Sequence, residues 1–179
     1  MHRADVPAQN GVERHLLLVG AMGVGKTTVG RELAARLGRP FLDSDVELER
    51  VFGDTGAQIT SRDGVARLHT LELELFSDMV ETDTPSVIAP AASVVDSATG
   101  RALLDGNVTI WLDAPEDVLA ARRGTGGHRR DVNDDEVIAL DRRRGPAWQE
   151  LATVRIDTSR SVADTLEALV PEVRRVEAG

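Results

Sequence analysis

Short apolar runs alternate along the chain with longer stretches in which apolar side chains recur every three or four positions. The short runs predict buried strands at residues 15–19, 40–43, 86–89, 108–112 and 154–157. The longer stretches predict helices at residues 27–37, 46–52, 64–81, 98–104, 115–122, 134–144 and 162–176. Gly145 and Pro146 are expected to end the helix at 134–144. Alternating strands and helices predict an α/β fold, with a five-stranded parallel sheet between two layers of helices.

A glycine-rich segment, GAMGVGKT at residues 20–27, lies between the first strand and the first helix. It fits the P-loop pattern G-x-x-x-x-G-K-[ST], in the strand-to-helix context that this motif requires. Glycines let the backbone approach phosphate closely, and the helix N-terminus adds unpaired N–H groups. Lys26 is expected to reach the β and γ phosphates, and the Thr27 hydroxyl to ligate Mg²⁺. The guanine-binding N-K-x-D pattern is absent after the fourth strand, so the sequence indicates ATP rather than GTP.

Two carboxylates, Asp43 and Asp45, follow the second strand directly. In a parallel sheet, ligands bind outside the carboxyl ends of the strands, so this pair should face the same crevice as the phosphate loop. One carboxylate can steady Mg²⁺, and the other can accept a proton from an acceptor hydroxyl. A purely structural alternative is that Asp43 ends the strand while Asp45 caps the next helix.

Basic residues gather in a second glycine-rich stretch, RGTGGHRR at residues 123–130. Its glycines supply flexibility and its arginines supply charge, as a lid closing over phosphates requires. Arg144, farther along the chain, can clamp an anionic acceptor. The alternatives are a solvated surface loop and a solvated helix end.

Composition narrows the classes of protein. The chain has 179 residues, 41% of them hydrophobic, and 21 basic against 30 acidic residues give a net charge of -9. Such acidity argues against nucleic-acid and membrane partners, and no apolar run approaches the ~20 residues of a membrane span. There is no cysteine, which excludes disulfides and thiol chemistry. We expect a cytoplasmic monomer with a flexible tail at residues 1–13 and a single P-loop domain at 14–179, carrying a lid at about 123–133.

Several segments together resemble the shikimate kinase family, from about residue 16 to 169. They are GAMGVGKTTVGRELAARLGRPFLDSD, GDTGAQI…RDGVARLHTLE, RRGTGGHRR and RRRGPAWQELATVRIDTS. A P-loop followed at this distance by F-L-D-[ST]-D is typical of shikimate and gluconate kinases. The resemblance implies a nucleoside-monophosphate-kinase-like fold with sheet order 2-3-1-4-5. It also implies a reaction in which ATP and Mg²⁺ serve to phosphorylate a small hydroxylated acid.

The resemblance also implies roles for individual residues. The phosphates of ATP would be held by Gly23, Val24, Gly25, Lys26, Thr27 and Thr28. Thr27 would bind Mg²⁺ directly and Asp43 through water, while Asp45 would bind the acceptor hydroxyls and act as the base. Arg130 would be the lid arginine, with Arg129 as the neighbouring choice, and Arg160 would lie near adenine. Arg144 would bind the acceptor.

Two departures from the family pattern fall on the acceptor side. Where the family has F-R-x-x-E, this chain has Leu68-His-Thr-Leu-Glu72, so His69 replaces an arginine that pairs with the shikimate carboxylate. Where the family has G-G-G after the third strand, this chain has Ala91-Ala92-Ser93, so Ala92 would line the substrate site with an added methyl group. Histidine is mostly neutral at pH 7, whereas arginine is always charged.

Three functional hypotheses stay open from the sequence. The first is a shikimate kinase with an altered carboxylate clamp. The second is a kinase for another small polyol or hydroxy acid. The third is a nucleotide-binding protein with little catalytic activity, serving regulation or assembly. The intact phosphate loop and the Asp43–Asp45 pair favour an enzyme, a small-molecule kinase that uses ATP.

Overall fold

Five parallel strands form the centre of the molecule in the computed structural model, which describes residues 14–125 and 134–179. In chain order they are β1 (Leu16–Val19), β2 (Phe41–Asp43), β3 (Val87–Ala89), β4 (Val108–Asp113) and β5 (Val154–Asp157). They lie side by side in the order β2-β3-β1-β4-β5, and every neighbouring pair is parallel. This confirms the predicted α/β fold and the sheet order that the family resemblance implied.

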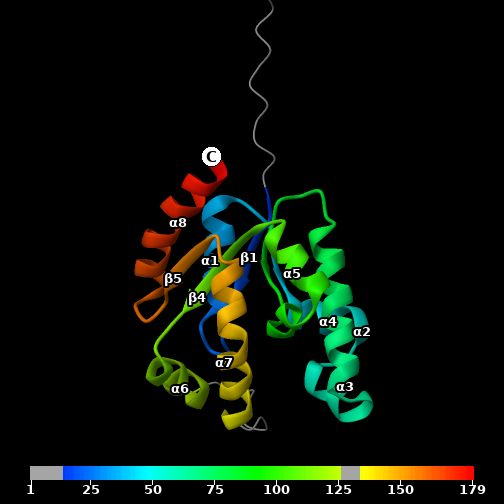
Figure 1. Ribbon diagram of the computed structural model, residues 1–179. Coiled ribbons are helices and arrows are strands. Elements are labelled where there is room, and N and C mark those ends of the chain that lie inside the picture. Colours follow the sequence, from blue (N-terminus) through cyan, green and yellow to red (C-terminus); the bar gives the residue numbers. More distant parts are fainter. Residues whose placement is uncertain (1–13, 126–133) are drawn as a thin grey trace, which may run out of the picture.

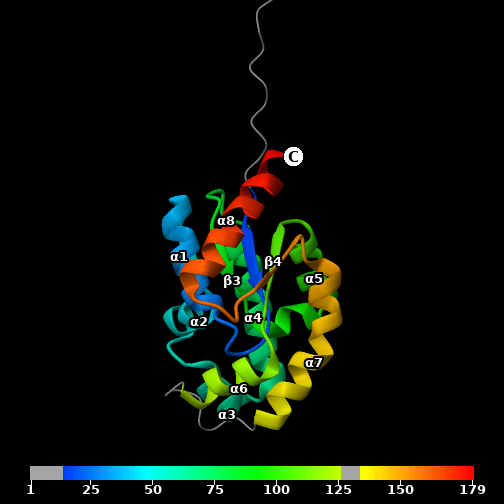
Figure 2. The ribbon, with the colours of Figure 1, turned by 90° about the vertical axis from the view of Figure 1, so that its left-hand side faces the viewer.

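Helices cover both faces of the sheet (Figures 1 and 2). One face packs against α1 (Lys26–Leu37) and α8 (Val162–Ala178), and the other against α4 (Val65–Val80), α5 (Ala98–Asp105) and α7 (Asp134–Leu151). The central strand shows why both layers are needed, since all four of its residues are buried. Leu16 and Leu18 belong to a first core cluster, between the sheet and helices α1 and α8. Leu17 and Val19 belong to a second core cluster, between the sheet and helices α4, α5 and α7. Successive side chains on a strand point to opposite faces, so a strand this apolar needs cover on both sides.

Four further helices complete the fold within the described residues: α2 (Ser44–Phe52), α3 (Gly56–Asp63), the 3₁₀ helix η1 (Ala92–Asp96) and α6 (Glu116–Thr125). Neither α3 nor η1 was predicted. The start of α3 is fixed by a capping box, in which Thr55 accepts from the Gln58 backbone N–H and Gln58 accepts from that of Thr55. The predicted tail at residues 1–13 lies outside the described residues, as does most of the predicted lid, 126–133. The single-domain interpretation and the lid therefore stay predictions.

The prediction that Gly145 and Pro146 end a helix is wrong. Helix α7 runs unbroken from Asp134 to Leu151 with Pro146 inside it. Proline removes one backbone donor and crowds the preceding turn, which disfavours such a helix by about 3 kcal/mol or more. Here the residues after the proline, Ala147 and Trp148, are buried in the second core cluster, and their burial offsets the local preference.

Candidate active site

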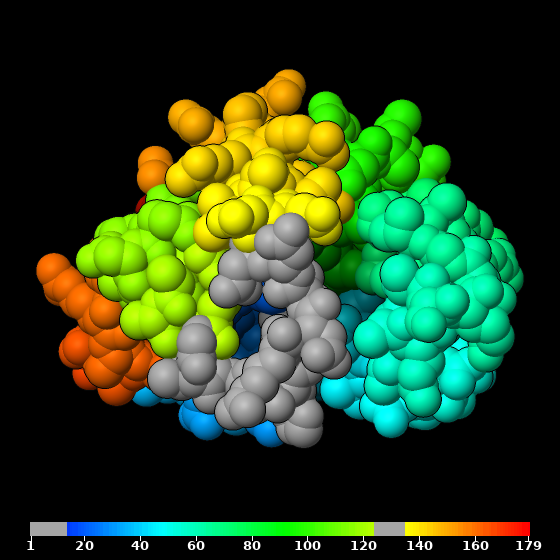
Figure 3. Space-filling view, turned by 90° about the horizontal axis from the view of Figure 1, so that it is seen from below, coloured from blue at the N-terminus to red at the C-terminus, as the bar shows by residue number. Residues whose placement is uncertain are grey.

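A cleft of about 760 Å³ opens at the carboxyl ends of β1, β2 and β3. In Figure 3 the atoms of the early part of the chain, coloured blue, lie at the bottom of a hollow between α6, α7 and the α2–α4 segment. The cleft collects most of the residues that the sequence singled out, namely Gly23, Gly25, Lys26, Thr27, Thr28, Asp43, Asp45, His69, Ala92 and Arg144. A ligand site outside the carboxyl ends of parallel strands is the expected position in an α/β sheet.

The phosphate loop requires glycine for two separate reasons. Gly20 has φ 142°, and a Cβ there would lie 2.3 Å from the carbonyl oxygen of Leu112 on β4. Gly25 caps α1 in the left-handed region, with φ 103°. The Lys26 ammonium donates to the carbonyl oxygens of Gly20 and Ala21 at 2.8 and 3.1 Å, so it lies along the loop. An ammonium held over unpaired N–H groups at a helix N-terminus makes a site for phosphate.

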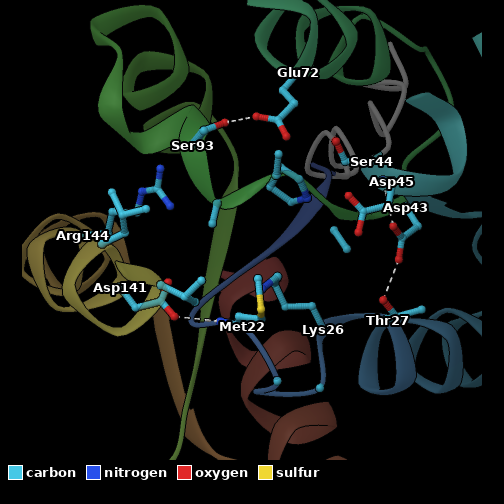
Figure 4. Close-up of a pocket in the computed structure, with 18 of the residues that line it drawn as sticks. Met22, Lys26, Thr27, Asp43, Ser44, Asp45, Glu72, Ser93, Asp141 and Arg144 are labelled. Carbon is cyan, nitrogen blue, oxygen red and sulfur yellow. Dashed lines mark hydrogen bonds between the residues drawn. The ribbon is translucent and has the colours of Figure 1, made fainter. Parts of the chain in front are cut away.

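The Thr27 hydroxyl and the Asp43 carboxylate meet at the edge of the loop. Thr27 Oγ1 donates to Asp43 Oδ2 at 2.7 Å (Figure 4). Asp43 Oδ1 accepts from the Asp45 backbone N–H at 3.0 Å. Asp43 is therefore the N-cap of α2, and Asp45 is in the first turn of the helix. The structural alternative, in which Asp45 caps the helix, is wrong, because the capping side chain is that of Asp43.

These two oxygen donors suit Mg²⁺. Magnesium prefers hard oxygen ligands and keeps several waters, so it needs only one or two protein groups beside the phosphates. Within residues 14–125 and 134–179, no three histidine or acidic side chains form a metal-binding group. A hydroxyl at the helix start with a carboxylate behind it fits an ion that arrives with its nucleotide, rather than a site made entirely of protein ligands.

Glu72 and Ser93 face each other in the part of the cleft lined by His69, Ala92 and Arg144, which we call the acceptor end because these three were predicted to bind the acceptor (Figure 4). The Ser93 hydroxyl donates a short hydrogen bond to Glu72 Oε2. Burial raises the pKa of Glu72 to about 6, with the nearby charge of Asp45 acting in the same direction and the bond from Ser93 opposing it. This contact could not be predicted from the sequence, since it depends on how α4 packs against η1.

His69 and Arg144 lie in the same region. Burial, followed by the positive charge of Arg144, lowers the pKa of His69, while Asp96 acts in the opposite direction. His69 is therefore neutral at pH 7 and adds no charge for an anionic acceptor. Arg144 is itself paired with Asp96, to which its Nη2 donates at 2.6 Å.

Helix α7 is also hydrogen-bonded to the phosphate loop. The Met22 backbone N–H donates to Asp141 Oδ2 at 3.0 Å (Figure 4). Asp141 precedes Arg144 by three positions, so one face of α7 contributes to both the loop and the acceptor end. The i, i+3 spacing of these two polar residues was visible in the sequence, but the contact of Asp141 with the phosphate loop was not.

Arg122 holds α6 against the phosphate loop and the end of β5. Its guanidinium donates to the carbonyl oxygens of Thr158 at 2.6 Å and Val24 at 3.4 Å. Arg122 and Arg123 both line the cleft; the sequence marked them only as a short basic patch that could serve a phosphate. The contacts of Arg122 with the phosphate loop and the end of β5 were not visible in the sequence, because they depend on the packing of α6.

Two of the described residues that were predicted for the site do not line the cleft with their side chains. Val24 is fully buried in the core, so it can contribute only its backbone to phosphate binding. Arg160 is exposed beyond β5 and is absent from the cleft lining. Arg130 and its neighbour Arg129 lie outside the described residues. The roles assigned to these residues stay predictions.

The fold and the cleft define a class: a P-loop phosphotransferase of the small-molecule kinase type. The sequence pattern of the family described as "Shikimate kinase" matches residues 22–174. The chain is 36% identical to a shikimate kinase of Symbiobacterium thermophilum over 165 residues, covering 89% of this chain and 93% of that one. It is 34% identical to a shikimate kinase of Thermobifida fusca over 157 residues, covering 86% and 91%.

A solved structure gives the same result. Shikimate kinase from Acinetobacter baumannii, in complex with shikimate, superposes with a TM-score of 0.83 at 29% identity, covering 93% of this chain and 95% of that one. This chain therefore belongs to the shikimate kinase family. It is a small-molecule kinase, and ATP is its co-substrate. Among the helices within residues 14–125 and 134–179, none is long and apolar enough to cross a membrane.

Proposed function

We propose that this protein transfers the γ-phosphoryl group of Mg²⁺-bound ATP to a hydroxyl of shikimate or a closely similar small hydroxy acid. One observation carries the proposal. A single cleft holds the phosphate loop with Lys26 on one side, Arg144 on the other, and the Asp45 carboxylate among its lining. A reaction between a nucleotide and a hydroxylated acid requires these three elements.

Each group then has a defined task. Lys26 and the loop N–H groups hold the phosphates, and Thr27 with Asp43 would hold Mg²⁺, which neutralises phosphate charge when bound. Asp45 orients the acceptor hydroxyl and accepts its proton as the oxygen attacks phosphorus. Arg144 binds the acceptor's carboxylate. Arg130, as the lid arginine, would stabilise charge on the transferring group.

Two variants separate nucleotide binding from transfer. Lys26→Ala removes a charge directed at the β and γ phosphates and should weaken ATP binding markedly. Asp45→Asn keeps the side-chain shape and removes the base, so shikimate-dependent ADP release should fall by roughly 10²-fold or more while ATP affinity changes little. Calorimetry with ATP and a coupled ADP-release assay provide the two measurements.

The proposal requires that Lys26→Ala loses ATP affinity and that Asp45→Asn loses turnover while keeping ATP affinity. Equal ATP affinity for wild type and Lys26→Ala would refute the phosphate-loop assignment. Undiminished turnover by Asp45→Asn would show that this residue serves only in the first turn of α2. Wild type that releases no ADP with shikimate, while binding ATP, would refute the proposed acceptor.

A further inference from the structure

Arg144, the one arginine at the acceptor end of the cleft among the described residues, already binds a carboxylate of the protein itself. Its Nε donates to both carboxylate oxygens of Asp96 at 3.1 Å, and its Nη2 donates to Oδ2 at 2.6 Å. The Arg144 side chain is 8% exposed and that of Asp96 is 40% exposed. This is the two-pronged arrangement in which arginine recognises carboxylates most strongly.

Asp96 reaches Arg144 from a neighbouring element. It is the last residue of η1, which begins at Ala92, while Arg144 belongs to α7. Both Ala92 and Arg144 line the cleft, whereas Asp96 itself does not. Asp96 therefore acts on the cleft through Arg144, and we describe it as a positioning residue rather than a catalytic one.

The charges around Arg144 make its pairing with Asp96 important. Two further acids, Asp45 and Glu72, line the same part of the cleft, and His69 is the only other cationic candidate there among the described residues. The pKa of His69 is lowered, so it is neutral at pH 7. The hydrogen bonds and charge of Arg144 outweigh burial and lower the pKa of Asp96, which keeps it ionised at pH 7. An incoming carboxylate thus meets an arginine whose charge is already balanced.

We propose that Asp96 sets acceptor selectivity by occupying the Nε–Nη2 edge of Arg144, which weakens the binding of acceptors that carry a carboxylate and leaves neutral acceptors unaffected. This inference rests on the proposed function, because it assumes that the acceptor binds beside Arg144. A carboxylate must either displace Asp96 or share the guanidinium with it at short range, and both lower its affinity.

A different role for Asp96 predicts the opposite result. If it served mainly to hold Arg144 in place for the acceptor, losing it would weaken carboxylate binding. Asp96→Asn separates the two, since asparagine keeps an oxygen that can accept from Arg144 and removes only the charge. Asp96→Ser also removes the charge and serves as a second variant if the first does not fold.

The experiment is calorimetry at pH 7.5 with Mg²⁺ and ADP present, using shikimate and its methyl ester, whose carboxylate is masked. Asp96→Asn should tighten shikimate binding by about tenfold, the scale of one charge-assisted contact, with methyl ester and ADP affinities unchanged. Glu172→Gln is the matched control: Glu172 also pairs with an arginine, Arg175, but on α8. This control should change none of the three affinities.

Unchanged or weaker shikimate binding in the Asp96 variants would overturn the inference, and so would an equal gain for the ester. Failure of the proposed function has a different signature, because wild type would then form no phosphorylated shikimate in the turnover assay. Calorimetry does not depend on turnover, so the two failures are distinguishable.

Discussion

Glu72 is a mostly buried carboxyl group whose pKa is raised to about 6, first by burial and then by the charge of Asp45. Its ordinary pKa is 4.5, so between pH 4.5 and 6 the native protein binds more protons than the unfolded chain. The free energy of unfolding should therefore fall as pH rises through this window. The Glu72 contribution is present below pH 4.5 and lost above pH 6, and amounts to roughly 2 kcal/mol or less.

Glu72→Gln should remove this dependence. The variant keeps an acceptor for the Ser93 hydroxyl, and its stability relative to wild type should rise between pH 4.5 and 7. Urea unfolding at several pH values measures the difference. Glu74→Gln, an exposed position on the same helix, is the matched control and should run parallel to wild type. If the difference in free energy of unfolding between Glu72→Gln and wild type stayed constant with pH, the raised pKa of Glu72 would be contradicted.

His69 is expected to limit the recognition of an anionic acceptor. Its lowered pKa means that it gains charge only when the pH falls below the ordinary value of 6.5. Shikimate binding by wild type should therefore be weak at neutral pH and tighten as the pH falls below that value. His69→Arg supplies a permanent charge, and should tighten binding at pH 7.5 by one to two decades.

Glu72 loses its negative charge over part of the pH range in which His69 gains its positive charge. The pH experiment therefore needs a control that separates the two residues. His69→Gln removes the titrating ring, so any pH dependence that the variant retains comes from other groups, Glu72 first among them. The measurement is the shikimate dissociation constant from pH 5 to 8. Tight binding by wild type that does not vary with pH would refute this account of His69.

At the scale of elements, α1 approaches the sheet through a glycine. A Cβ added at Gly30 would lie 2.4 Å from a ring carbon of Phe41 and 2.8 Å from Leu18. Gly30→Ala should therefore lower the free energy of unfolding by about 1–3 kcal/mol, the usual cost of overpacking a core. Gly106→Ala is the control, since φ there is -69° and a methyl group would meet nothing closer than 3.4 Å.

Urea denaturation of the two glycine variants gives the comparison. Equal stability would mean that α1 moves away from β2 without cost.

Elements governed by local chemistry were predictable from the sequence. The strand, phosphate loop and first helix depend on glycines and apolar runs that lie next to one another, and the structure has them where the motif implies. Thr55 and Gln58 form a capping box that was readable in the sequence and predicts α3, although that helix was not expected. Helix α7 continues through Pro146 because Trp148 is buried against distant elements, which no local pattern reveals.

The same distinction applies to the site. Lys26, Thr27, Asp43 and Asp45 were found because each belongs to a motif with a fixed place in an α/β sheet. Asp96 carries no motif, and its importance comes from a contact with a residue 48 positions away. Ser93 was noted as a departure from the family's G-G-G pattern. Its hydrogen bond to Glu72, however, depends on the packing of η1 against α4. Contacts between elements are what sequence patterns leave undetermined.

At the scale of the whole molecule, α7 links the two halves of the reaction. Its Asp141 accepts a hydrogen bond from the phosphate loop, and its Arg144 donates hydrogen bonds to η1. If the function is as proposed, nucleotide and acceptor would both bind against this helix, which favours a fixed distance between the γ-phosphoryl group and the acceptor hydroxyl. A small-molecule kinase needs this, because water competes for the same phosphoryl group.

The most direct test of the account is to identify the phosphorylated product. Wild type incubated with Mg²⁺, ATP and shikimate, and analysed by phosphorus NMR and mass spectrometry, should give phosphorylated shikimate in an amount equal to the ADP released. Asp45→Asn should give neither above background. ADP with inorganic phosphate and no phosphorylated shikimate, or no ADP at all, would contradict the claim that this cleft transfers phosphate to shikimate.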